Sequence, residues 1–256
     1  MIHTLVRHRA MAFVALLLTG CGQLSQAQTV PTTVTGAPTT TTTTVVELGV
    51  SAVGQRSGLS TKAAQQKLID LGFWLANVDG TYDNTTRQAV MAFQKYYLLR
   101  PTGSINEATA WLLDRQRIRP RALSTEGSHA EVDKARQLVF LVHSGETVFV
   151  LNASTGDDRE YIEPDGNTPG VMITGKAITP LGKFKINRER PDGWWVGDLG
   201  QIYRPKYFSG GIAIHGSYSV PAYPASHGCV RISTAAMDMI WDLDLLPRGT
   251  TVWVYE

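Results

Sequence analysis

The stretch Ile214-His-Gly-Ser-Tyr-Ser-Val-Pro-Ala-Tyr-Pro-Ala-Ser-His-Gly-Cys-Val-Arg-Ile232 is the most informative part of this sequence. It contains two histidines and Cys229, the only cysteine that follows Cys21. A cysteine attacks as its thiolate, and a free thiol with a pKa of about 8.5 is only slightly ionised at neutral pH. A nearby imidazole accepts the thiol proton, so the pattern predicts an ion pair between Cys229 and a histidine.

The glycine that precedes the cysteine adds to this prediction. Gly228 lets the backbone approach a substrate carbonyl closely, and the amides of Gly228 and Cys229 are predicted donors to a developing oxyanion. Two other interpretations compete with catalysis, a structural cysteine and a zinc site of His215, His227 and Cys229. The zinc site has no carboxylate or fourth ligand at a familiar spacing, so we expect neither a metal nor another cofactor.

The chain around this stretch has the pattern of a mainly β domain, which we expect over residues 129–256. Short apolar runs alternate with glycine and proline, and Ser144-Gly145 between the first two predicts a hairpin. One helix is expected at 234–243, and the whole pattern favours a sandwich or barrel. The expected strands are Leu138–Val142, Val148–Leu151, Val171–Thr174, Lys183–Ile186, Gly211–Ile214 and Thr251–Tyr255.

Residues 59–118 have helical periodicity and an internal repeat. Gly80 to Val90 aligns with Gly103 to Leu113, and each copy places a turn glycine before a helix cap, Asp83 or Asn106.

A third helix precedes the repeat, with Ser60 as its predicted cap and Gly72 at its end. The predicted fold class is therefore α+β multidomain, a small three-helix domain followed by the mainly β domain.

The first twenty-one residues are predicted to be an export signal. Arg7 and Arg9 precede an apolar run from Ala10 to Leu18, far shorter than the roughly 20 residues that span a bilayer. Leu18-Thr-Gly-Cys21 resembles a bacterial lipoprotein processing site, which implies lipidation of Cys21 and membrane attachment. A plain secretory peptide and an uncleaved anchor are the alternatives.

Residues 22–58 are predicted to be a disordered tether, because ten of the sixteen positions from Thr29 to Thr44 are threonine. The rest of the chain has ordinary globular composition, with 43% hydrophobic and 18% charged residues. A net charge of +2 excludes nucleic acid as an expected partner.

Residues 130–256 resemble the catalytic domain of the L,D-transpeptidase family, whose hallmark is His-Gly followed by Ser-His-Gly-Cys-x-Arg. Here these are His215-Gly216 and Ser226 to Arg231. Thr179-Pro-Leu-Gly-Lys-Phe184 and Ser154-Thr-Gly156 match two further family segments. The interval from the first histidine to the cysteine is shorter than in many members, which affects the expected shape of the lid.

The resemblance implies roles for individual residues. Cys229 is the expected nucleophile and His215 the proton acceptor and donor, oriented by the carbonyl of Gly216. Ser226 and His227 are expected to shape the nucleophile loop, and His227 is the second candidate for the base.

Arg231 is expected either to anchor that loop or to face a substrate carboxylate. Tyr203 and the pair Trp194-Trp195 are expected either to line the substrate cleft or to pack in the core.

The implied reaction is 3→3 cross-linking of peptidoglycan stem peptides through a thioester, with release of D-alanine. Three alternatives remain open: an L,D-carboxypeptidase with the same nucleophile, a non-catalytic wall-anchoring lipoprotein, and a zinc hydrolase.

The helical unit resembles the peptidoglycan-binding domain type 1 family. The matching segments are Gln66 to Gly72, Val78 to Gly80, Thr86, and Ala89 to Gln94. The resemblance implies that peptidoglycan is the partner of this unit, or that the unit is a spacer.

Overall fold

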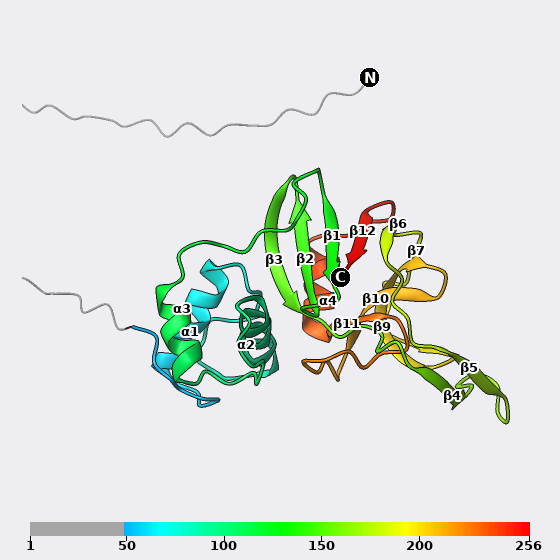
Figure 1. The fold of residues 1–256 in the computed structure, drawn as a ribbon, viewed down its shortest axis with the longest axis horizontal. Coiled ribbons are helices and arrows are strands. Elements are labelled where there is room, and N and C mark those ends of the chain that lie inside the picture. The colour runs from blue at the N-terminus through cyan, green and yellow to red at the C-terminus, as the bar shows by residue number, and fades with distance from the viewer. Residues whose placement is uncertain (1–48) are drawn as a thin grey trace, which may run out of the picture. The chain divides into compact units, whose positions relative to one another are not determined.

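The computed structural model describes residues 49–256 (Figure 1). The predicted signal peptide, Cys21 and most of the predicted tether lie outside the described residues. Residues 49–58 do not behave as a tether, since Val53 is buried and Gly54 exchanges two backbone hydrogen bonds of 2.9 Å with Ile105. The predicted end of the tether at residue 58 is therefore too late. Within the described part, no helix combines the length and the apolar character needed to cross a membrane.

The helical unit contains the three expected helices, and both predicted caps of the repeat are confirmed. Asp83 accepts a hydrogen bond of 2.8 Å from the Thr86 amide, and Asn106 accepts one of 2.9 Å from the Thr109 amide. These bonds satisfy backbone donors that have no partner within the first turn of a helix. The helices are α1 (Leu59–Asp70), α2 (Asn84–Tyr96) and α3 (Glu107–Arg115).

The predicted cap of the first helix, Ser60, is wrong. The helix α1 already begins at Leu59, because the carbonyl of Gly58 accepts the amide of Lys62 at 3.0 Å. Gly58 also donates its own amide to the Gly80 carbonyl at 2.8 Å, which ties the start of α1 to the first turn of the repeat.

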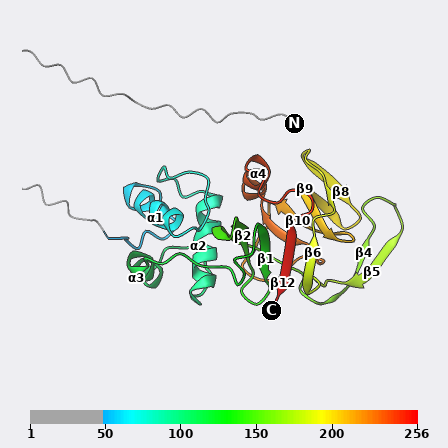
Figure 2. The ribbon, with the colours of Figure 1, turned by 90° about the horizontal axis from the view of Figure 1, so that it is seen from above.

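The part of the chain from residue 129 on is mainly β, as predicted, and is built from two sheets and a separate hairpin (Figures 1 and 2). The first sheet has the order β3-β2-β1-β12-β6 and the second the order β11-β10-β9-β7, with β8 added to β9. The hairpin is β4-β5. The strands of the first sheet are β1 (His129–Asp133), β2 (Leu138–His143), β3 (Glu146–Asn152), β6 (Gly182–Lys185) and β12 (Thr251–Tyr255). The second sheet contains β7 (Arg188–Glu189), β8 (Trp194–Gly197), β9 (Gly200–Ser209), β10 (Ile212–Ser217) and β11 (Val230–Ser233). The hairpin strands are β4 (Glu160–Pro164) and β5 (Met172–Lys176), and the helix α4 (Thr234–Asp242) follows β11.

The predicted hairpin at Ser144-Gly145 and the predicted helix near 234–243 are both present. The longest strand, β9, is missing from the sequence prediction. Its residues Gln201, Arg204, Pro205 and Lys206 interrupt any apolar run, although the strand pairs on both sides.

Both faces of β2 are buried, each in a different core. Val139 and Leu141 point into the core between the two sheets, whereas Leu138 and Phe140 point toward the helices. Because successive side chains of a strand alternate between faces, the apolar run of β2 belongs to two layers. The helix α2 packs against β2 and β3 (Figure 2). The helical unit and the first sheet therefore share one hydrophobic core.

Candidate active site

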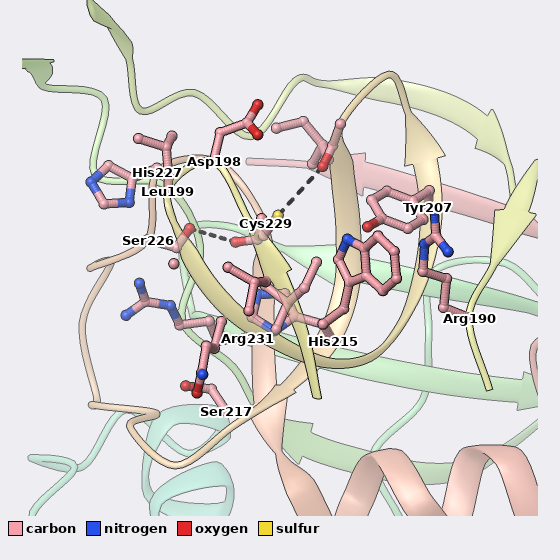
Figure 3. Close-up of a pocket in the computed structure, with 18 of the residues that line it drawn as sticks. Arg190, Asp198, Leu199, Tyr207, His215, Ser217, Ser226, His227, Cys229 and Arg231 are labelled. Atoms are coloured by element: carbon pink, nitrogen blue, oxygen red, sulfur yellow. Dashed lines mark hydrogen bonds between the residues drawn. The ribbon is translucent and has the colours of Figure 1, made fainter. Parts of the chain in front are cut away.

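The three predicted site residues Cys229, His215 and Arg231 lie on one face of the parallel pair β10-β11. Ile214 pairs with Val230 and His215 with Arg231. Since Ile214 and Val230 point into the core, strand alternation turns His215, Cys229 and Arg231 to the opposite face. There they line a cavity of about 780 Å³ (Figure 3).

His215 is buried and oriented as predicted. Its Nδ1 lies 2.9 Å from the carbonyl oxygen of Gly216. A carbonyl only accepts, so Nδ1 carries the proton and Nε2 is left with the basic lone pair. Burial lowers the pKa of His215 to about 4. The positive charge of Arg231 also lowers this pKa, whereas the hydrogen bond to the Gly216 carbonyl raises it. The imidazole is therefore neutral at pH 7.

The pKa of the Cys229 thiol is shifted as well. Burial raises its pKa, while the Ala213 amide and the positive charge of Arg231 act in the opposite direction. The Sγ atom points its proton to the Gly211 carbonyl at 3.8 Å. Burial disfavours the charged forms of both groups, and the predicted ion pair between Cys229 and a histidine stays a prediction. The arrangement can also transfer the proton to His215 during attack, when the sulfur forms its bond to carbon.

Ser226 forms hydrogen bonds within the loop that contains Cys229. Its hydroxyl donates to the carbonyl of Cys229 and accepts the amide of Gly228 at 3.1 Å. The Gly228 amide therefore already has an acceptor in this structure, and its use in an oxyanion hole stays a prediction. The amide of Cys229 is the remaining predicted donor.

Gly228 is a glycine for a different reason than predicted. Its φ is +129°, and a Cβ atom there would lie 2.7 Å from the carbonyl oxygen of Ile178. Close packing against the Ile178 segment, and not the approach of a substrate, excludes a side chain.

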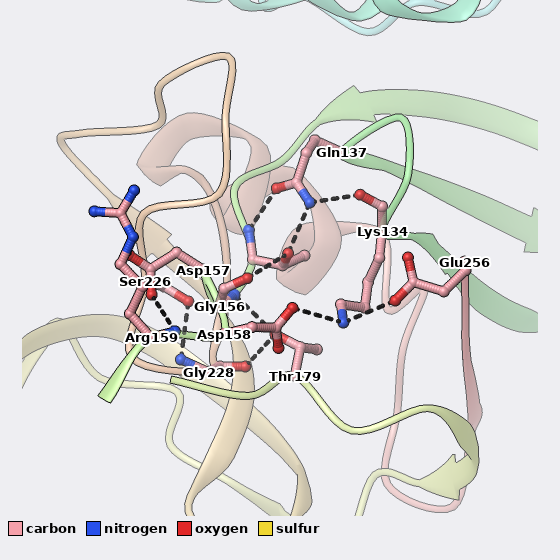
Figure 4. A network of polar contacts seen from close by, with 11 residues as sticks. Lys134, Gln137, Gly156, Asp157, Asp158, Arg159, Thr179, Ser226, Gly228 and Glu256 are labelled. Carbon is pink, nitrogen blue, oxygen red and sulfur yellow. Dashed lines mark hydrogen bonds and ion pairs between the residues drawn. The ribbon is translucent and has the colours of Figure 1, made fainter. Parts of the chain in front are cut away.

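The segments that begin at Ser154 and at Thr179, which also match the family, contact each other and this loop (Figure 4). The buried hydroxyl of Thr179 donates to the Gly228 carbonyl at 2.6 Å and accepts the Gly156 amide at 2.9 Å. The Thr155 carbonyl accepts the Ser226 amide at 3.0 Å.

Gln137 completes this network, because its Nε2 donates a hydrogen bond of 2.7 Å to the Thr155 hydroxyl. Sequence reasoning missed Gln137, because nothing in its local pattern distinguishes it from an ordinary turn residue.

His227 lies at the rim of the cavity and faces the β4-β5 hairpin. Its Nε2 lies 2.8 Å from the carboxylate of Glu163, and its ring packs edge-on against Tyr161 with centroids 4.8 Å apart. This ring is engaged with the hairpin, whereas the basic Nε2 of His215 has no hydrogen-bond partner among the described residues.

The predicted aromatic lining is only partly present. Trp195 lines the cavity, whereas Tyr203 and Trp194 do not. The two tryptophans are neighbours in β8 and so point to opposite faces. The Tyr203 hydroxyl donates to Asp238 at 3.0 Å, and its ring packs on Trp194. Tyr203 and Trp194 therefore pack against other side chains and do not line the cleft, which is the second of the two alternatives expected from the sequence.

The outer wall of the cavity contains residues that the sequence analysis did not identify. The turns of the β4-β5 and β8-β9 hairpins meet there, where Asn167 donates to Asp198 at 2.7 Å. Arg188 and Arg190 add two guanidinium groups. Among residues 49–256, no three histidine, cysteine or acidic side chains gather as a metal site, so the zinc interpretation has no ligand set.

Comparisons with known proteins agree with this architecture. The model of the L,D-transpeptidase catalytic domain matches residues 127–254, and that of a peptidoglycan-binding domain matches residues 57–113. No curated protein matches the chain.

Solved structures provide two further comparisons. The chain is similar to the crystal structure of an L,D-transpeptidase from Xylanimonas cellulosilytica, with 42% identity and a TM-score of 0.69 over 78% of this chain and 94% of that one. An L,D-transpeptidase from Stackebrandtia nassauensis has 18% identity and a TM-score of 0.43 over 81% of this chain and 96% of that one.

Proposed function

The chain belongs to the L,D-transpeptidase family, and we propose on that premise that it forms 3→3 cross-links in peptidoglycan with Cys229 as nucleophile. The observation that carries the proposal is the tautomer of His215. The Gly216 carbonyl holds the proton on Nδ1, so that Nε2 is a base on the same face of the sheet as Cys229.

In the first half-reaction, the sulfur of Cys229 attacks the carbonyl between the diamino acid and the terminal D-alanine of a donor stem. His215 Nε2 takes the thiol proton as the S–C bond forms. The Cys229 amide stabilises the negative oxygen of the tetrahedral intermediate. The C–N bond then breaks, the imidazolium returns the proton to the leaving amine, and D-alanine departs from a thioester.

In the second half-reaction, an amine of a neighbouring stem attacks the thioester carbonyl. His215 takes a proton from this amine and returns it to the sulfur as the amide forms. A positioned amine reacts faster than water does, which favours cross-linking. Attack by water on the same thioester gives the L,D-carboxypeptidase reaction, which is the second candidate function.

Arg231 supports the proposal from beside the nucleophile. It lines the cavity, and its guanidinium has no carboxylate partner among the described residues. Burial lowers its pKa, and an ionised Cys229 would oppose this shift. An arginine stays protonated in proteins, so the guanidinium is a cation without a paired anion. We assign it to the terminal carboxylate of the leaving D-alanine, which lies a few bonds from the scissile carbonyl.

The test is mass spectrometry of products after incubation of the purified protein with disaccharide-tetrapeptides. A dimer that has lost one D-alanine supports cross-linking, and tripeptides alone indicate the carboxypeptidase. Absence of both products with a folded protein leaves the non-catalytic wall anchor as the function. A chelator arm tests the zinc hydrolase, because only that enzyme loses activity with the chelator.

We further propose that this is an exported lipoprotein of the cell envelope, with residues 1–21 as signal, Cys21 as the lipidated residue and the helical unit as its wall contact. The match of that unit to a peptidoglycan-binding domain supports the envelope location. Replacement of Cys21 by alanine should move the protein from the membrane fraction to the soluble fraction. An unchanged fractionation would argue against lipid attachment.

A further inference from the structure

The wall of the cavity opposite Arg231 contains two arginines that the reaction described above does not use. Arg188 and Arg190 flank Glu189, so strand alternation turns both guanidinium groups to one face and the carboxylate to the other. Both arginines line the cavity. Glu189 binds Lys206 at 2.6 Å on the far side of the strand. The one acidic residue of this segment is therefore unavailable to the arginines.

Each guanidinium lies over an aromatic ring. The Arg188 Cζ is 3.9 Å from the centroid of Tyr207, and the Arg190 Cζ is 3.6 Å from that of Trp195. Stacking holds the plane of an arginine while its N–H groups at the edge stay available. That edge fits the two oxygens of a carboxylate.

Neither guanidinium has an ion-pair partner among residues 49–256. The Nε of Arg190 is buried without an acceptor, although a buried N–H is normally paired. Among the described residues that line the cavity, Asp198 is the only carboxylate, and it accepts from Asn167. Three arginines therefore face one engaged aspartate.

Figure 3 shows Arg190 and Arg231 on opposite sides of Cys229 and His215. A peptide whose scissile carbonyl lies at Cys229 extends in both directions from it. Because Arg231 is assigned to the leaving D-alanine, the acyl part of the donor stem extends from Cys229 toward the side of the cavity that contains Arg190.

We propose that Arg188 and Arg190 form a subsite that binds a carboxylate on the acyl part of the donor peptide. The enzyme then selects stems whose acyl part carries this carboxylate over stems in which it is replaced by a carboxamide. This inference rests on the proposed function, which supplies the direction of the peptide. A carboxamide has the same shape but offers one acceptor, brings no charge and places an N–H₂ group against a guanidinium.

The test compares two synthetic donor peptides that differ only in this carboxylate or carboxamide. For the wild-type protein, kcat/KM for D-alanine release is expected to be about 10- to 100-fold higher with the carboxylate, the range of a charged hydrogen-bonded pair. In the double variant Arg188→Gln/Arg190→Gln, this ratio should fall toward one. The variant Arg188→Lys/Arg190→Lys keeps the charges without the planar fork and should retain an intermediate ratio.

The matched control is Arg159→Gln, since this side chain is 85% exposed and does not line the cavity. Its ratio should equal that of the wild-type protein. Equal use of both peptides by the wild-type protein, or a ratio that survives in Arg188→Gln/Arg190→Gln, would overturn the subsite while the proposed function stands.

If the wild-type protein releases D-alanine from neither peptide, the proposed function fails and the subsite is judged by binding alone. Calorimetry with Cys229→Ala then compares the two peptides without turnover. Tighter binding of the carboxylate peptide that is lost on adding Arg188→Gln/Arg190→Gln supports the subsite, and equal binding overturns it.

Discussion

Two regions with buried polar side chains differ in how those side chains are paired, the contact between α2 and the first sheet and the cavity around Cys229. At the contact, Lys95 donates to the carbonyls of Gln137 and Ala153, both at 3.0 Å. Asn152 donates to Gln88 at 2.6 Å, and only the Asn152 Oδ1 lacks a partner. These bonds join residues that are far apart in the sequence, which makes the contact a structural interface.

In the cavity, several polar groups have no hydrogen-bond or ion-pair partner among the described residues. The Nε2 of His215, the guanidinium of Arg231 and the Nε of Arg190 have no protein partner in the described part of the chain. An unpaired buried group lowers stability, so it persists where a ligand supplies the missing partner. The contrast predicts that substitutions in the cavity change chemistry and those at the interface change stability.

Cys229→Ala is expected to have the largest effect. Loss of the proposed nucleophile should reduce D-alanine release by about 10⁴-fold or more. The free energy of unfolding should change by no more than about 1 kcal/mol, because the sulfur is half-buried at the edge of the cavity. Product analysis and urea unfolding measure the two quantities. A folded Cys229→Ala protein with normal turnover would break the catalytic assignment.

His215→Ala should lower the acylation rate by about 10²- to 10⁴-fold, the usual value of a general base. His227→Ala should lower it by less than about 10-fold, because its ring is bound to Glu163. Pre-steady-state release of D-alanine gives both rates. A larger loss in a folded His227→Ala protein would exchange the two roles.

The pH profile sharpens the assignment of His215. The neutral imidazole is the active form and its pKa is about 4, so kcat/KM should persist below pH 6 and fall as the pH drops through about 4. Circular dichroism at each pH verifies folding. An acid limb near the ordinary histidine pKa of about 6.5 would contradict the buried neutral base.

Phe140→Ala tests the interface. Phe140 is fully buried between the sheet and α2, and its removal should lower the free energy of unfolding by about 3–5 kcal/mol. The kcat/KM of the folded fraction should remain that of the wild-type protein. Trp111→Ala, at an exposed position of α3, is the control and should change stability by about 0.5 kcal/mol or less. Equal losses in the two variants would mean that the helical unit does not share a core with the sheet.

Lys95→Met has the smallest expected effect. Burial lowers the pKa of Lys95 to about 7, whereas an unfolded lysine has a pKa of about 10.4. Between these values the unfolded chain binds more protons, so this residue makes stability rise with pH. Relative to Lys95→Met, the wild-type protein should gain about 1 kcal/mol from pH 7 to pH 8. A difference that does not change with pH would show that Lys95 is not desolvated.

Local features of this protein could be read from its sequence. The caps Asp83 and Asn106, the turn at Ser144-Gly145 and the helix after Ser233 all depend on residues within a few positions of one another. Backbone sterics and short-range hydrogen bonds decide such features. The segments His215-Gly216 and Ser226 to Arg231 also identified the site residues from the sequence, whereas the parallel pairing of β10 with β11 was not predicted.

The tertiary structure alone decided the electrostatics and the boundaries of the site. The lowered pKa of His215 and the raised pKa of Cys229 follow from desolvation by residues of several strands, which no local pattern reveals. The engagement of the Gly228 amide, the place of Arg190 in the cavity wall and the second core on β2 likewise depend on segments far apart in the chain. Charge, burial and hydrogen-bond satisfaction are properties of neighbours in space, and only the fold determines which residues become neighbours.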